Sequence, residues 1–394
     1  MSGLHVCVVP SNYPNPYLPE KTPFYRDHAR LPLLAGHRSG VAGLIPVSLR
    51  AVLRRGPRAL GLHRFEDSGV PTRLRLYVAP PRWPAMDRWR RGRLMRELSR
   101  GYAAEQGAPD LLHAHGTAAA QDALRWHAHS GTPFVVTLHA AEFYAPDARA
   151  RIEAIRPALA TAAARVAVSP GFADHLARLS DLPFEVLPNP VDTEWFRDDR
   201  VPGDSDSTSG FTFTFASVGA LNAIKNHRLL INAFARAFPD EPGVRLRIAG
   251  EGPEREHLRR QIDELGLASR VELAGQCSRE EIRSLLQGCD ALVHTSRMET
   301  FGVVLAEALA CGRPVVATRT HGAESVLQSR ELGELCEHSE AALAEGMRTV
   351  HQRRYDPQQL RDEARRRFGM VAVSRALDAL YQRVLARDGA YAEP

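Results

Sequence analysis

Two series of alternating strand-like and helix-like segments constrain the fold of this chain more than any other feature of its sequence. In the first series, apolar runs of strand length recur with helix-length segments between several of them. These runs are Leu4–Pro10, Val41–Val47, Arg73–Val78, Asp110–His115, Pro133–Leu138, Arg165–Ser169 and Phe184–Leu187. Such alternation is typical of βαβ units and predicts a parallel sheet covered by helices.

A polar stretch rich in Gly, Ser, Asp and Pro, Arg197–Gly210, interrupts this pattern and predicts a linker. A second series of strand-like runs follows, again with helical segments between them: FTFTFASVG, GVRLRIAG, RVELAG, DALVHTS and RPVVAT. The last helical pattern, about Met370 to Asp388, has no strand after it. The sequence therefore predicts an α/β protein with two doubly wound, Rossmann-like domains facing a cleft. We place the first domain at residues 1–195 and the second at residues 196–370.

Length and composition agree with a globular protein of two domains. A chain of 394 residues is too long for one ordinary core. It contains no run of about 18 apolar residues that would predict a membrane span. The start, MSGLHVCVVP, lacks the cationic region and cleavage site of a signal peptide. The five scattered cysteines form no C-x-x-C pair, which favours reduced thiols and a cytoplasmic location.

The chain is basic, with a formal charge of +5, which allows nucleic acid, a membrane surface or an anionic substrate as partner. Only two of its 51 basic residues are lysines, Lys21 and Lys225. Because a lysine is a compact point charge and arginine is a planar fork, these two positions merit separate attention. The basic segment Arg82–Arg100 could rest on an anionic membrane. A solvated helix that covers the first sheet is the favoured interpretation.

Ligands of doubly wound sheets bind at the carboxyl ends of the strands, so the loops after the second-series strands are expected to form the site. Lys225 follows the first of these strands, and Gly250 and Gly252 follow the second. Glycines allow close backbone approach, and helix N-termini favour negative charge. Together, these loops predict a site for phosphate.

The segment SRMETFGVVLAEALACGRPVV places Glu299 and Glu307 on either side of a helix start near Gly302. Glu307 would lie in the second turn and could accept hydrogen bonds from ribose hydroxyls, as the acidic residue of dinucleotide-binding folds does. In the alternative interpretation, Glu299 only stabilises the helix N-terminus and Glu307 is a solvated residue. The neighbouring phosphate-type loops favour the ligand-binding interpretation.

At these motifs the chain resembles the retaining GT-B glycosyltransferases of family 4, the glycosyl transferases group 1. Glu299 through Glu307 matches the E-x7-E motif of that family. SVGALNAIKNHRLLINAF is similar to its first C-domain strand, phosphate lysine and helix, and LPNPVDTEWF to its interdomain segment. DLLHAHG, FVVTLHAAEFY and VAVSPGFADHL match weaker patterns of the first domain. The resemblance implies a GT-B fold, in which we expect a C-terminal helix at residues 371–394 to pack back toward the first domain.

The resemblance also implies roles for individual residues. Lys225 would bind the donor diphosphate and stabilise the leaving nucleotide, Glu307 would hold the ribose, and Glu299 would contact the sugar and phosphates. His139 would lie beside the anomeric carbon. The further donor contacts implied are Gly219, Gly250 and Gly252, the base-contacting loop Gln276, Cys277, Ser278 and Arg279, and the backbone of Phe301, Gly302, Val303 and Val304.

Two positions depart from the family pattern. Ala220 stands where the family usually has an arginine, which removes one phosphate cation. The first loop has no glycine between Pro10 and Ala29, although most members have a glycine-rich loop there. Lys21 lies in this loop, and we predict that it supplies part of the missing positive charge. A solvent-exposed loop lysine is the alternative.

The predicted function is that of a retaining, metal-independent hexosyltransferase (EC 2.4 type). The predicted donor is a nucleoside-diphosphate sugar, with UDP expected first and GDP second. The acceptor would be a small polar metabolite, a natural-product precursor, or a glycan or lipid-linked sugar. We expect no cofactor, metal or nucleic acid. The sequence allows weak peripheral membrane contact and a homodimer.

Two other functions fit the sequence less well than a glycosyltransferase. A nucleotide-sugar-binding pseudoenzyme is motivated by Ala220. A nucleotide-dependent oxidoreductase would need G-x-G-x-x-G after the first strand of a domain, and neither VVPSNYPNP nor SVGALNAIKN provides it. His113 and His115 share one strand face and could bind metal, but an ordinary role at the strand end is favoured.

Overall fold

The computed structural model describes residues 3–15, 24–56, 60–78, 84–139, 141–198 and 212–390. The chain divides into two compact units. Unit 1 contains Met1–Pro190 and Met370–Pro394, and unit 2 contains Val191–Gly369. The sequence placed the first boundary after residue 195, but Val191 pairs with Gly369, and helix α7 (Thr193–Phe196) packs against other helices of unit 2. These contacts assign residues 191–195 to unit 2.

Unit 1 is built on an eight-stranded sheet with strand order β3-β4-β2-β1-β5-β6-β7-β8. The strands are β1 His5–Pro10, β2 Arg38–Val47, β3 Gly61–Asp67, β4 Val70–Val78, β5 Leu111–His115, β6 Phe134–Leu138, β7 Ala164–Ala167 and β8 Glu185–Val186. All neighbours are parallel except β3 and β4, which form an antiparallel hairpin. Sequence analysis did not predict β3, because the charged segment GLHRFED is an edge strand without an apolar run.

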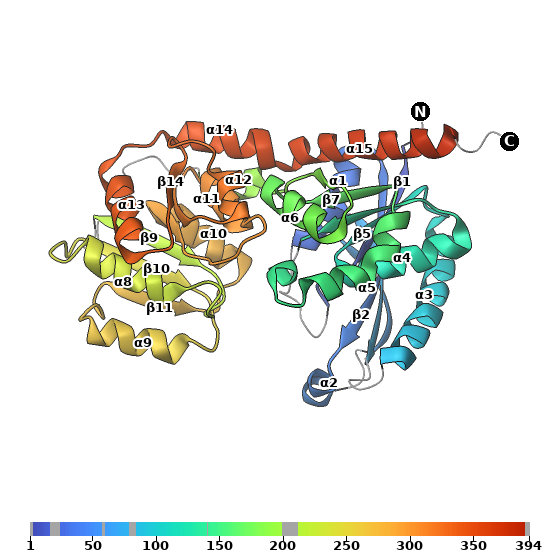
Figure 1. Cartoon of the computed structure of the whole chain (residues 1–394), viewed down its shortest axis with the longest axis horizontal. Coiled ribbons are helices and arrows are strands. Elements are labelled where there is room, and N and C mark those ends of the chain that lie inside the picture. Colours follow the sequence, from blue (N-terminus) through green and yellow to red (C-terminus); the bar gives the residue numbers. More distant parts are fainter. Residues whose placement is uncertain are drawn as a thin grey trace. The chain divides into compact units, whose positions relative to one another are not determined.

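Helices cover this sheet on both faces, as expected for a doubly wound fold. They are α1 Phe24–Leu34, α2 Leu49–Arg55, α3 Pro84–Gln106, α4 Thr117–Ser130, the 3₁₀ helix η2 Ala141–Tyr144, α5 Ala148–Thr161, α6 Pro170–Ser180 and α15 Met370–Ala390. Helix α15 lies along unit 1 beside α1 (Figure 1). Its residues Val373, Leu377 and Tyr381 share a core with residues of the central strands. The C-terminal helix therefore returns to the first domain.

The basic segment predicted as a helix corresponds to α3, which packs against strands β2 and β4 and against α4. Met95 and Leu98 are buried, whereas Trp89 is 67% exposed. A buried ion pair fastens α3 to α4: Arg91 Nε donates to Asp122 Oδ1 at 2.8 Å, and the Asp122 side chain is fully enclosed. The helix therefore covers the sheet and is held by polar as well as apolar contacts.

Unit 2 has a parallel sheet of six strands in the order β11-β10-β9-β12-β13-β14. The strands are β9 Phe213–Val218, β10 Val244–Ala249, β11 Val271–Gly275, β12 Ala291–His294, β13 Val315–Thr318 and β14 Gly333–Cys336. Five of them follow the predicted runs. The sequence did not indicate β14, because the short segment GELC is only partly buried.

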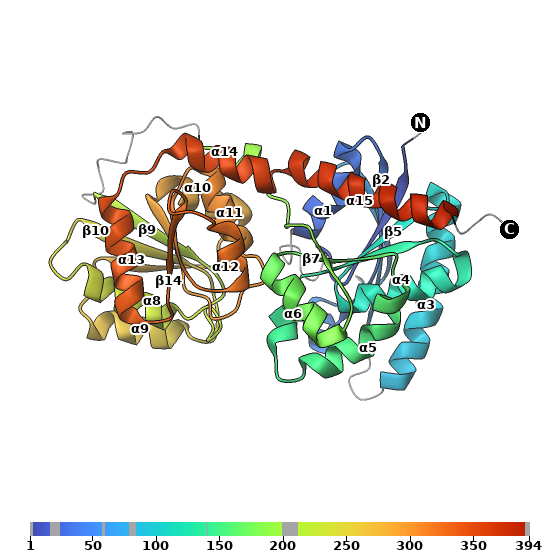
Figure 2. The same ribbon diagram turned by 45° about the horizontal axis from the view of Figure 1, so that its top comes forward.

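The helices of unit 2 are α7, α8 His227–Ala237, α9 Arg255–Glu264, α10 Arg279–Gly288, α11 Val303–Ala310, α12 His321–Val326, α13 Glu340–Gln352 and α14 Pro357–Phe368. Helices α8 and α13 pack against one another over the sheet (Figure 2). The core beneath them includes Phe215, Phe234 and Val293. The predicted α/β architecture with two parallel, Rossmann-like sheets is confirmed. Among the described helices, none combines the length and the apolar character needed to cross a membrane.

Candidate active site

Lys225 and Glu299, two of the predicted site residues, are in direct contact in unit 2. Lys225 Nζ donates to Glu299 Oε2 at 2.6 Å. The lysine stands in the loop between β9 and α8, and Asn222 Oδ1 accepts a hydrogen bond from its backbone N–H. Thr295, after β12, donates to the Lys225 carbonyl at 2.8 Å. Two neighbouring strand ends therefore fix the position of the lysine.

Glu299 is kept ionised by its neighbours. His294, the last residue of β12, donates from Nε2 to the same Oε2 oxygen at 3.2 Å. Burial alone would raise the pKa of Glu299, but the hydrogen bond from His294 and the charge of Lys225 outweigh it and lower the pKa to about 2. The result is a fixed carboxylate with a cation beside it at the carboxyl end of the sheet.

The loop after Glu299 leads into the N-terminus of α11. Gly302 adopts a left-handed conformation with φ of 79°, and a Cβ there would lie 2.9 Å from Leu305 Cδ1. No side chain caps the helix, so its first N–H groups lack intrahelical partners. Phe301 packs its ring against Phe368 at 5.3 Å, which leaves only its backbone for a ligand.

Glu307 lies on the partly exposed side of α11. Val303, Val304 and Glu307 are half-buried, whereas the other residues of this helix are buried. Because Val303 and Glu307 are four residues apart, they share one face near the helix N-terminus. The structure thus groups Lys225, Glu299 and the start of α11, with Glu307 one turn further along.

The predicted glycines have a packing role of their own. A Cβ on Gly250 would come within 2.0 Å of the Gly219 carbonyl oxygen, and one on Gly252 within 2.3 Å of the Leu221 carbonyl oxygen. Gly219 N–H donates to Ala249 at 3.0 Å. The glycines therefore allow the loops after β9 and β10 to lie against each other, and this close packing already accounts for their small size.

The loop after β11 is partly occupied by structural contacts. Ser278 caps α10 through a reciprocal pair of hydrogen bonds with Glu281. The Arg279 guanidinium lies over the Trp195 ring at 5.0 Å. Burial raises the pKa of the Cys277 thiol, so it is not a reactive thiolate. Gln276 is the exposed member of this loop, whereas Cys277, Ser278 and Arg279 are half-buried.

His139 belongs to unit 1, where it follows β6 and is enclosed by other polar side chains. Its Nδ1 pairs with Asn189 Oδ1 at 2.9 Å and its Nε2 with His115 Nδ1 at 2.9 Å. Asn189 also pairs with His28 Nε2 at 3.0 Å. Burial lowers the pKa of His139 well below 6.5, so its imidazole is neutral.

Sequence analysis did not predict His294 or His28, although both lie beside predicted site residues. His294 ends a predicted strand, so the strand-end rule could have found it. His28 lies inside helix α1, and no sequence pattern indicated it. His113 pairs with Tyr381 and Thr137, each at 2.7 Å, in keeping with the favoured structural role. Lys21 lies outside the described residues.

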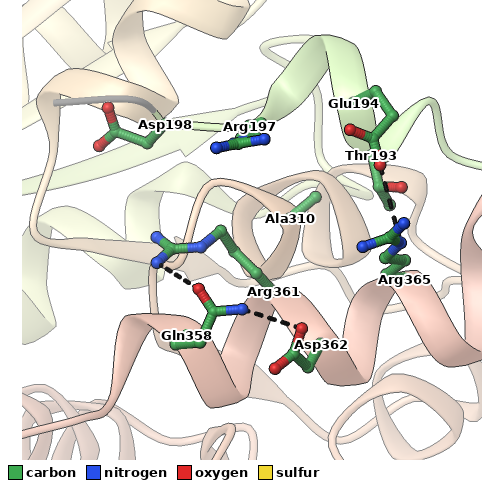
Figure 3. A pocket seen from close by; sticks show the side chains of 9 residues that line it. All are labelled: Thr193, Glu194, Arg197, Asp198, Ala310, Gln358, Arg361, Asp362 and Arg365. Carbon is green, nitrogen blue, oxygen red and sulfur yellow. Dashed lines mark hydrogen bonds and ion pairs between the residues drawn. The ribbon is translucent and has the colours of Figure 1, made fainter.

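A separate pocket of about 340 Å³ lies elsewhere in unit 2 (Figure 3). It is lined by Thr193, Glu194, Arg197, Asp198, Ala310, Gln358, Arg361, Asp362 and Arg365. Its polar groups largely pair with each other: Arg361 donates to Gln358 at 3.0 Å, and Gln358 donates to Asp362 at 2.9 Å. None of the described site residues named above lines this pocket.

Comparison with known proteins finds two family matches in separate stretches of the chain. Residues 209–367 match the family described as Glycosyl transferases group 1. Residues 50–195 match the family described as Glycosyltransferase Family 4. The first stretch contains Lys225, Glu299 and Glu307, and the second contains His139.

Curated relatives match over shorter stretches. The phosphatidylinositol N-acetylglucosaminyltransferase gpi3 subunit of Schizosaccharomyces pombe is 33% identical over 144 residues, which are 36% of this chain and 30% of the relative. The N-acetyl-alpha-D-glucosaminyl L-malate synthase of Bacillus anthracis is 33% identical over 114 residues, 29% of each chain. The matched stretch spans about a third of the length of such relatives.

Solved structures match nearly the whole chain. HepE of Anabaena, in complex with UDP and glucose, has a TM-score of 0.71 at 19% identity and covers 96% of this chain and 100% of its own. Sucrose-phosphate synthase of Thermosynechococcus elongatus has a TM-score of 0.74 at 18% identity and covers 98% and 100%. At these identities the likeness establishes the fold.

Proposed function

Because the chain belongs to the GT-B glycosyltransferases of family 4, we propose that it transfers a hexose from a nucleoside-diphosphate sugar to an acceptor with retention of the anomeric configuration. The observation that carries this proposal is the contact of Lys225 with Glu299 beside the uncapped N-terminus of α11. A cation and a helix N-terminus without a side-chain cap suit a diphosphate, and a fixed carboxylate suits sugar hydroxyls.

In the proposed reaction, the bond between the anomeric carbon and the phosphate oxygen breaks and a bond to the acceptor oxygen forms on the same face. The acceptor proton passes to an oxygen of the departing diphosphate. Negative charge grows on that diphosphate as the sugar becomes oxocarbenium-like. Lys225 has three N–H donors, of which Glu299 occupies one, so the others remain to stabilise this charge.

The remaining residues serve positioning roles in this proposal. Glu307 holds the ribose, and the backbone from Phe301 to Val304 contacts the phosphates and sugar. To bind the sugar near the anomeric carbon, the neutral imidazole of His139 exchanges its Nε2 hydrogen bond with His115 for one from a sugar hydroxyl. Gln276 contacts the base. Since His139 and the diphosphate site belong to different units, His139→Ala should lower kcat far more than nucleotide affinity.

UDP is the proposed nucleotide of the donor, with GDP as the second choice. The structurally similar HepE was crystallised with UDP and glucose. The names of the two relatives above both mention an N-acetylglucosaminyl group. One is a phosphatidylinositol N-acetylglucosaminyltransferase subunit, and the other is an N-acetylglucosaminyl malate synthase. The acceptor is accordingly proposed to be a polar metabolite, a natural-product precursor, or a glycan or lipid-linked sugar.

The test is a panel of UDP-, GDP- and ADP-sugars, screened by thermal shift and by slow release of nucleoside diphosphate without acceptor. We expect one nucleotide to raise the melting temperature, and its sugar to be hydrolysed at an unchanged rate in excess EDTA. If EDTA abolishes release and Mg²⁺ restores it, the assignment of the phosphate charge to protein groups is wrong.

A nucleotide-sugar-binding protein without turnover is the second candidate, favoured by Ala220. This residue is exposed next to the Lys225 loop and offers no cation. Binding of a sugar nucleotide without release of nucleoside diphosphate, with or without candidate acceptors, would support this second candidate over the first.

A further inference from the structure

Three buried histidines of unit 1 converge on one point. A ring nitrogen from each of His28, His115 and His139 lies within 4.8 Å of those from the other two. The exposed fractions of these three residues are 2%, 0% and 9%. They come from α1, from the end of β5 and from the residue after β6, so the fold brings them together from three separate elements.

The hydrogen bonds determine which ring nitrogens carry protons. Asn189 Oδ1 can only accept, so Nε2 of His28 and Nδ1 of His139 both donate to it. His139 then has a lone pair on Nε2, which accepts a hydrogen bond from Nδ1 of His115. Nδ1 of His28 and Nε2 of His115 are therefore left unprotonated.

These two nitrogens are buried lone pairs without a hydrogen-bond partner among the described residues. Burying an unpaired polar atom is costly, so each such atom calls for an explanation. Protonation does not provide one, because burial lowers the pKa of His28 to about 4 and the pKa of His115 well below 6.5. Neutral imidazoles with free lone pairs are the form in which histidine ligates transition metals.

We propose that His28, His115 and His139 form a binding site for one transition-metal ion of the zinc class. Three imidazoles with a fourth position open to a small molecule form a known coordination set for Zn²⁺, and Cu²⁺ and Ni²⁺ also prefer such ligands. Asn189 would act as the outer partner that orients two of the ligands. Zn–N bonds are about 2.0–2.1 Å long, so the three ligand nitrogens would lie closer to one another in the metal-bound form than in this structure.

Occupation of this site would take His139 out of its sugar-binding role, because its Nε2 would exchange the hydrogen bond from His115 for a metal bond. Zn²⁺ should therefore inhibit sugar transfer. This consequence rests on the proposed function, whereas metal binding itself does not. If the enzyme required a metal ion, a chelator would abolish turnover. Here a chelator should instead restore the turnover that Zn²⁺ has inhibited.

The test titrates the full chain with Zn²⁺ against a chromophoric chelator, without any sugar donor. We expect one ion per chain, with an affinity lowered at least tenfold in His28→Gln and in His115→Gln. His338→Gln, an exposed histidine of unit 2, is the matched control and should bind as the wild type does. Equal affinities in all four proteins would overturn the proposal.

A spectroscopic measurement on the unmutated chain covers the case in which a histidine variant fails to fold. Co²⁺ in the site should give the intense visible absorption of a four-coordinate ion, and X-ray absorption of the Zn²⁺ form should show three imidazole ligands. Weak octahedral Co²⁺ absorption, or fewer than three imidazoles, would also overturn the proposal. Because neither readout uses a donor sugar, failure of the transferase assays leaves this test intact.

Discussion

Single side chains of the candidate active site are held by contacts that also define their charge. Glu299 illustrates this, because one carboxylate oxygen accepts hydrogen bonds from both Lys225 and His294. Glu307 differs from it, since it stands on the partly exposed face of a helix. The two glutamates of the E-x7-E motif therefore have different electrostatic environments, and substitutions at each should have different consequences.

We predict that Glu307→Gln weakens nucleotide binding by about 1.5–3 kcal/mol, the value of a hydrogen bond to a charged group. Isothermal calorimetry with the free nucleotide and with its sugar measures this loss. Glu264→Gln, the same change on an exposed residue of α9, serves as the control and should bind normally. Unchanged affinity in the Glu307 variant would exclude a ribose-binding role.

The contacts of Glu299 should stabilise unit 2 at neutral pH. Its pKa is lowered from 4.5 to about 2 in the folded chain, so the unfolded chain binds the proton first. The stabilisation is therefore complete above pH 4.5 and is lost as the pH falls toward 2. We expect Glu299→Gln to lower the free energy of unfolding at pH 7 by about 1.5–3 kcal/mol. Urea unfolding at pH 7, 5, 4 and 3 should show the same difference at pH 7 and 5 and a progressively smaller one at pH 4 and 3. A difference that stays constant down to pH 3 would contradict the assignment.

At the scale of elements, α3 shows how a basic helix is attached to the sheet. Arg91 donates to Asp122 of α4 and, at 2.9 Å, to the Tyr77 hydroxyl of β4. Both members of the ion pair are buried. A buried pair contributes little net stability, but loss of one partner leaves an uncompensated charge.

Asp122→Asn should therefore destabilise unit 1 by about 3–5 kcal/mol. The exposed pair Arg93–Glu97 on the same helix provides the control, and Glu97→Gln should cost less than about 1 kcal/mol. Chemical unfolding followed by far-ultraviolet circular dichroism compares the two variants. Similar losses in both would mean that the buried pair is effectively solvated.

The sequence predicted well those elements whose secondary structure is indicated by their own residues, without regard to their neighbours in the fold. Buried parallel strands such as Pro133–Leu138 are continuous apolar runs, so their positions could be inferred from composition alone. Strand β3 could not be inferred, because an edge strand needs no apolar run and depends on pairing with β4. The contact of His28 with Asn189 joins residues 161 positions apart, and no local pattern records it.

For the candidate site, the motif residues Lys225 and Glu299 were predicted and are in contact, whereas their partner His294 was not. The motif identifies the residues expected to face the ligand. The neighbour that lowers the pKa of Glu299 is brought to it by the tertiary fold and is not part of the motif. The same limit applies to the glycines, where sequence indicated ligand approach and the structure shows loops packed against each other.

At the scale of the whole molecule, the chain forms two units with separate cores, of which unit 1 is discontinuous in sequence. Helix α15 contributes Leu377, which is 1% exposed, and Tyr381, which pairs with His113. The stability of unit 1 therefore depends on residues that follow unit 2 along the chain.

We expect Leu377→Ala to destabilise unit 1 by about 2–5 kcal/mol, because it removes buried apolar volume. Val371→Ala on the same helix is the control, since Val371 is 54% exposed and should contribute little. Hydrogen exchange resolved by peptide measures each unit separately, and protection in unit 2 should not change. Equal loss of protection in both units would show that they unfold as one.

The discontinuity of unit 1 also sets the order in which the nascent protein can be completed. The ribosome makes most of unit 1 first, then all of unit 2, and α15 last. Until residues 370–390 leave the exit tunnel, the surface around Val6, Leu111 and Val135 lacks the helix that covers it. Unit 2 is continuous in sequence, so its core can form before unit 1 is complete. The domain translated first is therefore the last to be finished, and the apolar surface that α15 covers stays uncovered throughout the synthesis of its neighbour.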